Sequence, residues 1–319
     1  TRDLGLFDVT MAAAGAMVGA AVFLLLGATL QVAAQWSFVS IGFAALLALF
    51  GGMAYAELAS GRPDASGGAY VWVRSVLPTP SGFLSGWLSW SGAMATASLS
   101  ALGLGLFLLE LLAPRDAFFG SSPPLAPVVG LAVLVLVAVS HLARVHVSTR
   151  TLSRITLVKI VLIVGLPALG LAALLPGGQS SLGTLGTASP GILGIVLGAG
   201  IFFIAFQGFE TVAQLSDQAK VPERTVPRAI FLAVGLALGV YLLFLLSVLA
   251  NAPAGYLAAW PACTACHGAT EDLFLAAIRG FAVGQPGIRV ALLLVGIVAM
   301  YAALNASAIS CTVRISSPY

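Results

Sequence analysis

The chain has 319 residues, of which 60% are hydrophobic and 8% charged, and its formal net charge is +3. Because a soluble domain has about 25% charged residues, this chain cannot cover a water-facing surface with charge. Its repeated apolar runs are long enough to cross a hydrocarbon core about 30 Å thick, and they lack the alternation of β-barrel strands. The composition therefore predicts an all-α integral membrane protein and excludes a soluble nucleotide enzyme.

Eight apolar stretches follow one another along the chain, and Pro and Gly mark the loops between them. Each stretch is long enough for a membrane-spanning helix. We therefore predict about eight transmembrane helices, at residues 8–34, 38–61, 82–112, 125–143, 155–175, 191–215, 228–250 and 288–312. No basic cluster or phosphate-binding glycine loop is found outside these stretches, so no nucleic-acid partner is expected.

Lys and Arg are distributed unevenly over the predicted loops. With the N-terminus in the cytoplasm, the inner segments and helix ends hold Arg2, Arg62, Arg74, Arg144, Arg150, Arg154, Lys159, Lys220, Arg224, Arg228 and Arg314. The outer segments hold only Arg115, Arg279 and Arg289. Cytoplasmic loops are enriched in Lys and Arg. This asymmetry predicts a multi-pass protein of the cell (inner) membrane, with a cytoplasmic N-terminus and a periplasmic loop at about 251–287.

The first predicted span is unusually rich in small residues between Gly15 and Phe23. A helix that unwinds there frees backbone groups in mid-membrane, and the N-terminus of the second half-helix offers partial positive charge to a carboxylate. The alternative is close helix packing through small residues. The sequence around Gly15 alone leaves both readings open.

The sixth predicted span is also interrupted, because Gly198 and Gly200 precede a run that ends at Glu210. Two interrupted spans in corresponding positions indicate a binding site at the interface of two repeats. An acid inside a span is costly, so Glu210 is expected to face protein or water. It either forms a structural hydrogen bond to the unwound backbone or contacts substrate directly.

Three segments, in this order, are similar to the signature motifs of one transporter superfamily. They are Gly15–Phe23, then Tyr55–Ala59 with Pro63, Ser66–Tyr70 and Arg74, then Phe203–Glu210 with Lys220, Pro222, Pro227 and Arg228. The chain thus resembles the amino acid, polyamine and organocation (APC) superfamily, which includes the amino-acid permeases. The resemblance implies a five-plus-five inverted-repeat fold with the first and sixth helices broken. Residues 1–175 would form the first repeat, with helices 1–5, and residues 176–319 a partial second repeat, with helices 6–8.

The resemblance also implies a function and a site. The expected function is secondary active amino-acid transport, coupled to protons, so the partners are an amino acid, a proton and the lipid bilayer, and the chain is not an enzyme. The implied substrate-binding residues are Gly15, Ala16, Met17, Val18, Gly19, Phe206, Gln207, Gly208 and Glu210. Phe202, Phe203 and Phe206 are candidates for a hydrophobic lid, with Phe206 favoured because it lies in the break.

Lys159 lies inside the fifth predicted span, about one turn or more from its cytoplasmic end. Its side chain could extend to the interface, as long cationic side chains near helix ends do. In the proton-coupled branch of the superfamily, however, a lysine at this place stands where sodium-coupled relatives hold a cation. Lys159 is therefore also a candidate for proton coupling.

The outer loop contains a C-x-x-C-H motif formed by Cys263, Cys266 and His267. In c-type cytochromes two such cysteines hold haem and the histidine binds its iron. The loop has no Met, and the other histidines lie near the opposite face, so a second axial ligand is missing. The alternatives to a covalent c-type haem are a Cys263–Cys266 disulfide and a chance match.

The superfamily normally has twelve spans, whereas this chain stops three helices into the second repeat. We therefore expect either a segment of a longer protein or a shortened derivative. In the second case, one alternative function is a transporter-derived accessory subunit of a larger membrane complex, carrying haem for electron transfer and bound to other membrane subunits. Another is a structural membrane subunit without a cofactor.

Overall fold

The computed structural model describes residues 3–61, 69–112, 125–142, 149–174, 191–210, 212, 215–251 and 286–316. Over these residues the secondary structure is helical, and the one β element is an isolated parallel bridge between Leu4 and Ala219. The prediction of an all-α protein is confirmed for this part of the chain.

The helices follow the predicted order. They are α1 (Leu6–Met17), α2 (Ala20–Ala33), the short 3-10 helix η1 (Ala34–Trp36), α3 (Ser37–Gly61), α4 (Ala69–Val76), α5 (Thr79–Leu112), α6 (Leu125–Leu142), α7 (Thr149–Leu174), α8 (Gly191–Phe203), the 3-10 helices η3 (Ile204–Phe206) and η4 (Ser216–Gln218), α10 (Pro222–Asn251) and α13 (Pro286–Ser316). Helices occupy all eight predicted ranges. Within the part of the chain that the structure describes, length and apolarity identify four stretches that could cross a membrane, at Ala20–Ala59, Pro80–Leu112, Pro222–Ser247 and Val290–Ser307.

Three features differ from the sequence prediction. The helix α7 begins at Thr149, before the predicted start of that span at residue 155. The helix α10 begins at Pro222, earlier than predicted, because proline suits the first helical position and Glu223 lies in the first turn, where an acid is favourable. The sequence did not predict α4. This short helix is amphipathic, with Trp72 buried and Arg74 exposed, so no long apolar stretch marks it.

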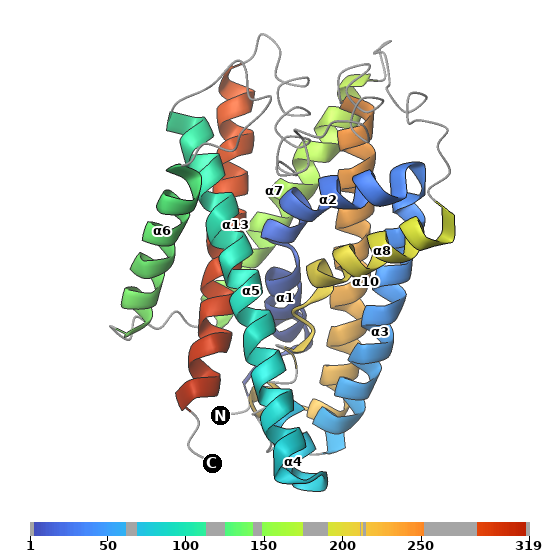
Figure 1. The fold of residues 1–319 in the computed structure, drawn as a ribbon, viewed down its shortest axis with the longest axis vertical. Coiled ribbons are helices and arrows are strands. Elements are labelled where there is room, and N and C mark those ends of the chain that lie inside the picture. The colour runs from blue at the N-terminus through green and yellow to red at the C-terminus, as the bar shows by residue number, and fades with distance from the viewer. Residues whose placement is uncertain are drawn as a thin grey trace.

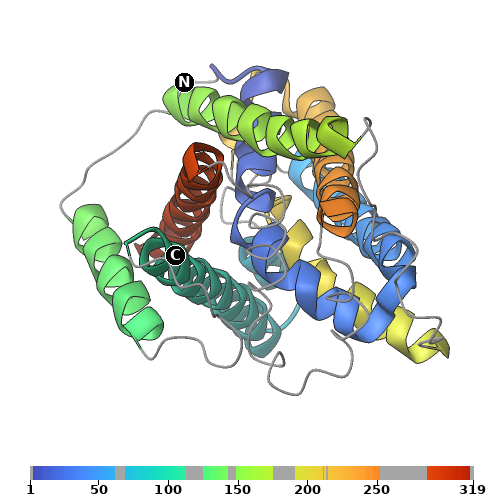
Figure 2. The same cartoon turned by 90° about the horizontal axis from the view of Figure 1, so that it is seen from above.

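The helices form two groups, which are visible in both ribbon views (Figures 1 and 2). In the larger helix group, α3 packs on α8 and α10, α1 packs on α10, and α2 packs on α8. In the smaller helix group, α5 packs on α4, α6 and α13. Between the groups, α7 contacts α1 and α10 on one side and α13 on the other. This arrangement puts α1 where the two groups meet.

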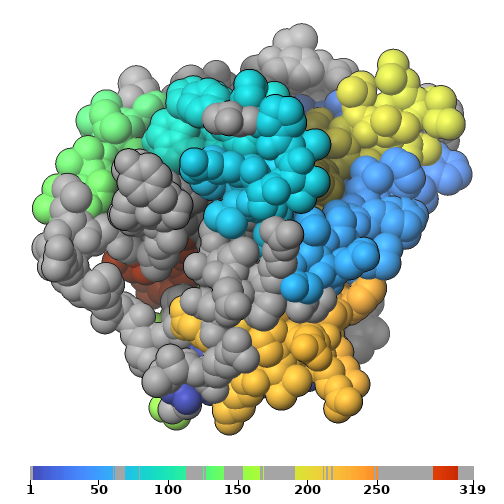
Figure 3. Space-filling model, turned by 90° about the horizontal axis from the view of Figure 1, so that it is seen from below, coloured from blue at the N-terminus to red at the C-terminus, as the bar shows by residue number. Residues whose placement is uncertain are grey.

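Seen from below, the end of α3 lies between the beginning of α10 and the α4–α5 segment (Figure 3). Higher in the molecule, the main hydrophobic core surrounds the junction of α1 and α2 and the end of α8, and it includes Met17, Phe206 and Tyr241. The main core of the described residues therefore includes both places where broken helices were predicted.

Candidate functional site

The first predicted span is interrupted in the middle. The helix α1 ends at Met17 and α2 begins at Ala20, while Val18 and Gly19 have non-helical backbone angles (φ −78°, ψ 88° and φ −149°, ψ −136°). Such a break leaves the last carbonyls of one helix and the first amides of the next without helical partners. The break in the first helix, which the family resemblance implied, is present.

Three groups from different parts of the chain satisfy carbonyls at the end of α1. The Val18 amide donates to Ala14 O at 2.8 Å, and Lys159 Nζ donates to Gly15 O at 2.7 Å. The Tyr241 hydroxyl lies 2.8 Å from Met17 O. A bare carbonyl in the hydrocarbon region costs several kcal/mol, so these contacts stabilise the break.

The sixth predicted span is interrupted too. The helix α8 ends at Phe203, the single turn η3 follows, and the Gln207 amide donates to Ile204 O at 3.2 Å. Gly208 has φ +137°, in the region that favours glycine. The chain leaves the helix at this point.

The two breaks are in direct contact. A Cβ atom placed on Gly208 would lie 2.9 Å from the Met17 amide nitrogen and 3.0 Å from Ala16 Cβ. Both distances are shorter than ordinary van der Waals contact, so only glycine fits between these backbones. The structure thus brings Ala16, Met17 and Gly208 together, and their role in binding substrate stays a prediction.

Lys159 is buried on α7, with 2% of its surface exposed. Its side chain points to the α1 break rather than to the membrane interface, so the alternative of a side chain that extends to the interface is wrong for this structure. Its neighbour Thr156 packs against Gly15, where an added Cβ would lie 2.5 Å from Thr156 Oγ1. The two side chains fix α7 against the end of α1.

The helix α5 contributes polar groups to the second break. The Thr96 hydroxyl lies 3.3 Å from Gln207 Oε1 and 3.0 Å from the carbonyl oxygen of Gly92, one turn earlier. Thr96 and Gln207 are both partly exposed. This pair connects the smaller helix group to the larger one beside the two breaks, and the sequence analysis did not include Thr96.

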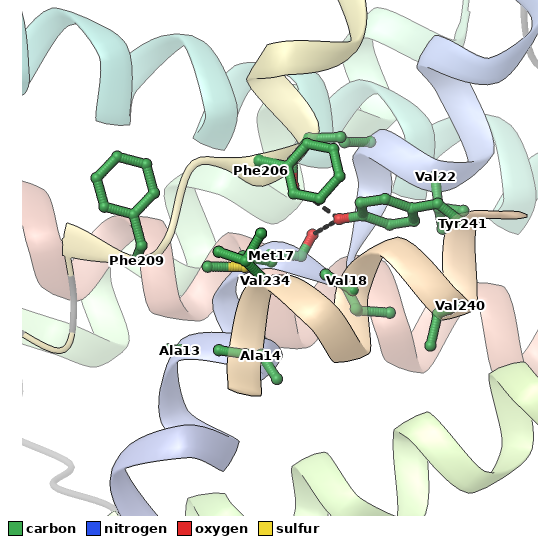
Figure 4. Packing of buried hydrophobic residues seen from close by; sticks show 14 of the residues in the cluster. Ala13, Ala14, Met17, Val18, Val22, Phe206, Phe209, Val234, Val240 and Tyr241 are labelled. Carbon is green, nitrogen blue, oxygen red and sulfur yellow. Dashed lines mark hydrogen bonds between the residues drawn. The ribbon is translucent and has the colours of Figure 1, made fainter. Parts of the chain in front are cut away.

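The aromatic residues near the second break are packed in the core. Phe202 and Phe206 have no exposed surface, and each ring lies edge-on to Tyr241, at 5.1 Å between ring centroids. Figure 4 shows Phe206 beside Tyr241. Phe203 is partly exposed. In this structure Phe206 packs against α10, so the lid role remains a prediction.

The other predicted site residues differ from one another in burial. Val18 and Gly19 are buried in the first break, whereas Glu210 follows the second break and is only half-buried. The haem candidates Cys263, Cys266 and His267 lie outside the described residues. Among the described residues, no three His, Cys, Asp or Glu side chains are grouped so that they could hold a metal ion.

The model of the amino acid permease family matches residues 4–314, which include both breaks and Lys159. The chain belongs to the amino acid permease family. This membership agrees with the resemblance seen in the motifs, and it places the chain among transport proteins and not among enzymes.

Individual permeases and transporters are similar to most of the chain. Over 252 residues it is 31% identical to an uncharacterized transporter of Mycobacterium tuberculosis, an alignment that covers 78% of this chain and 53% of that protein. It is 26% identical to a branched-chain amino acid permease of Bacillus subtilis over 252 residues, 73% of this chain and 51% of that protein. It is 28% identical to the methylthioribose transporter of Bacillus subtilis over 254 residues, 76% of this chain and 53% of that protein. The chain spans about half the length of these relatives.

Proposed function

We propose that the chain carries the substrate site of a secondary active amino-acid transporter that is coupled to protons. The observation that carries the proposal is the contact between the two helix breaks at Met17 and Gly208, next to a buried lysine. Paired broken helices at mid-membrane are how many secondary transporters bind charged small molecules. The family membership and the relative named for branched-chain amino acids support an amino acid as that molecule.

The first break provides backbone groups with partial positive charge and others with partial negative charge. The helix α2 starts at Ala20 with Gly19 as its N-cap, and no side chain caps its first amides. These amides and the positive end of the helix dipole suit a carboxylate. The carbonyls at the ends of α1 and η3 carry the opposite partial charge, and each has two lone pairs, so a carbonyl that already accepts one hydrogen bond can also accept one from an ammonium group. An amino acid has both groups on one carbon, so it matches this pair of helix ends.

Proton coupling is assigned to Lys159. Lys159 Nζ donates a hydrogen bond to Gly15 O, two residues before the end of α1. A change in the charge of Lys159 therefore changes the strength of a hydrogen bond next to the break. Hydrogen bonds from charged donors are about twice as strong as those from neutral ones. Loss of the proton would therefore loosen α1 from α7, and this gives a route from protonation to movement of the site.

The larger architecture is part of the proposal. Helices α1 to α7 would form the first repeat, and α8 to α13 would begin the second, inverted one. The eight predicted spans would cross the inner membrane with the N-terminus in the cytoplasm. The larger and smaller helix groups would then be the two rigid bodies that rock against each other during transport. The substrate would lie between α1, α5 and the second break.

The test is uptake by the purified chain reconstituted in liposomes. Each of the twenty radiolabelled L-amino acids, and methylthioribose, is supplied outside, with the lumen more alkaline than the medium. We expect at least one amino acid to accumulate, and a protonophore to abolish the accumulation. Absence of uptake for all twenty would contradict the proposal, and uptake of methylthioribose alone would contradict its amino-acid specificity.

A c-type haem at Cys263, Cys266 and His267 is a separate proposal, which rests on the sequence motif and the predicted outer position of the loop. It adds nothing to the transport mechanism proposed for the helix breaks. Its test is given in the Discussion.

A further inference from the structure

We infer that Tyr241 is a positioning residue that fastens the two helix breaks to each other through its hydroxyl group. Tyr241 lies in the middle of α10, and none of its surface is exposed. Its hydroxyl oxygen is 2.8 Å from Met17 O and 2.7 Å from Ala205 O (Figure 4). One side chain thus contacts the last residue of α1 and the turn that ends α8.

Both acceptors are carbonyls that the helix breaks release. Met17 O belongs to the last turn of α1, and Ala205 O belongs to η3, after which the chain leaves the helix. The last carbonyls of a helix have no partner further along it. Tyr241 is the side chain that places a donor beside both carbonyls.

A phenolic hydroxyl has one proton and two acceptors are in reach, so the proton is shared between them or alternates. Both carbonyls can use this one donor only while both stay within hydrogen-bond distance of the hydroxyl oxygen. If the two breaks move apart, one buried carbonyl loses its partner, which is costly away from water. The hydroxyl therefore favours the arrangement in which both breaks are close.

The ring of Tyr241 is held in place by its surroundings. Phe202 and Phe206 lie edge-on to it at 5.1 Å between centroids, on the same turn that carries Ala205. The hydroxyl position is thus fixed by aromatic packing, which a phenylalanine would retain. The inference goes beyond the proposed function, because it requires only that the two breaks act as one unit.

Hydrogen exchange in the variant Tyr241→Phe, in lipid nanodiscs, tests the inference without any substrate. We expect the backbone amides of residues 18–22 and of residues 206–209 to exchange about three- to tenfold faster than in the wild type, since one hydrogen bond is removed. The control Tyr301→Phe removes a hydroxyl from an exposed position on α13 and should change neither segment. Unchanged exchange in Tyr241→Phe, or faster exchange in only one segment, would overturn the inference.

A second variant covers the case in which Tyr241→Phe does not fold. Replacement of Tyr241 by p-aminophenylalanine keeps the ring and supplies two N–H donors, one for each carbonyl. We expect wild-type or slower exchange in both segments. Faster exchange in this variant would show that the ring environment, and not a shared donor, holds the breaks together.

Uptake of a transported amino acid links the inference to function. With the breaks loosened, Tyr241→Phe should raise KM about three- to tenfold, while the maximal rate per folded protein changes less than twofold. An unchanged KM would contradict the role in positioning the site. If the wild type transports nothing, the proposed function fails, but the hydrogen-exchange result still decides the role of Tyr241.

Discussion

Lys159 Nζ and Gly15 O are 2.7 Å apart, although 144 positions separate the two residues in the chain. The contact joins the middle of α7 to the end of α1, next to the first helix break. The lysine is buried, so its charge state acts on the backbone of the break and not on solvent. This geometry makes the contact a link between protonation and the proposed binding site.

The contact between α1 and α7 at Gly15 should leave no room for an added methyl group. Gly15→Ala would place a Cβ 2.5 Å from Thr156 Oγ1 and 2.9 Å from its Cγ2. We expect it to lower the free energy of unfolding by about 1–3 kcal/mol, the usual range for overpacking. Denaturation in detergent micelles measures this change, with Gly165→Ala on α7, where no atom lies within 4 Å, as the control.

The variant Gly15→Ala/Thr156→Ala checks the cause. It removes both crowded atoms of the threonine, so we expect at least half of the lost stability to return. Purely additive losses in the double variant would show that the glycine is needed for another reason.

Gly208 should be indispensable for the contact between the breaks. Its φ of +137° is unfavourable for alanine, and a Cβ would also lie 2.9 Å from the Met17 amide nitrogen. Such backbone strain costs about 1–3 kcal/mol, so Gly208→Ala should weaken binding of a transported amino acid by about tenfold or more. Equilibrium binding of the radiolabelled substrate measures this. Gly200→Ala, at an exposed position with open space, should bind like the wild type, and equal affinities of the two variants would contradict the prediction.

Gln207 should affect substrate affinity more than stability. It is partly exposed beside the second break, and Thr96 is its hydrogen-bond partner on α5. We expect Gln207→Leu to raise KM about fivefold, because one net hydrogen bond is worth about 1 kcal/mol, with little change in melting temperature. The matched change Gln35→Leu, at an exposed position in η1, should leave KM unchanged. A large fall in melting temperature with unchanged KM would assign Gln207 to structure alone.

The C-x-x-C-H motif gives a prediction that is independent of transport. If Cys263 and Cys266 hold haem covalently, protein made in cells with a periplasmic haem-attachment system will retain haem staining on a denaturing gel. The variant Cys263→Ser/Cys266→Ser should lose the stained band. A wild-type protein without stain would remove the haem proposal and leave the transport proposal intact.

Much of the fold was predictable because apolar length and helix breaks depend on local composition. The break at Val18 and Gly19 lies in a run of small residues, which by itself left close helix packing as an alternative. The second break was expected after Gly198 and Gly200, but these residues lie inside α8, and the chain leaves the helix at Gln207 and Gly208. The amphipathic helix α4 was missed because its buried face is provided by single residues such as Trp72.

The roles of individual side chains were less predictable, because they depend on contacts between distant segments. Tyr241 is a polar group within a long apolar run, but nothing local shows that it reaches a carbonyl 224 positions away. The position of Lys159 left two orientations open, and packing on α1 decided between them. Glu210 has helical conformation directly after the second break and is half-buried, so its position alone does not decide between a structural role and a contact with substrate.

The most direct test of the central claim is uptake driven by a pH gradient in the variant Lys159→Ala. Its matched control is Lys220→Ala, which changes the other of the chain's two lysines, at an exposed position. With an alkaline lumen and a substrate of the wild type, we predict that Lys220→Ala accumulates it and that Lys159→Ala does not, while Lys159→Ala still exchanges internal for external substrate. Accumulation by Lys159→Ala at the wild-type level would contradict proton coupling through Lys159.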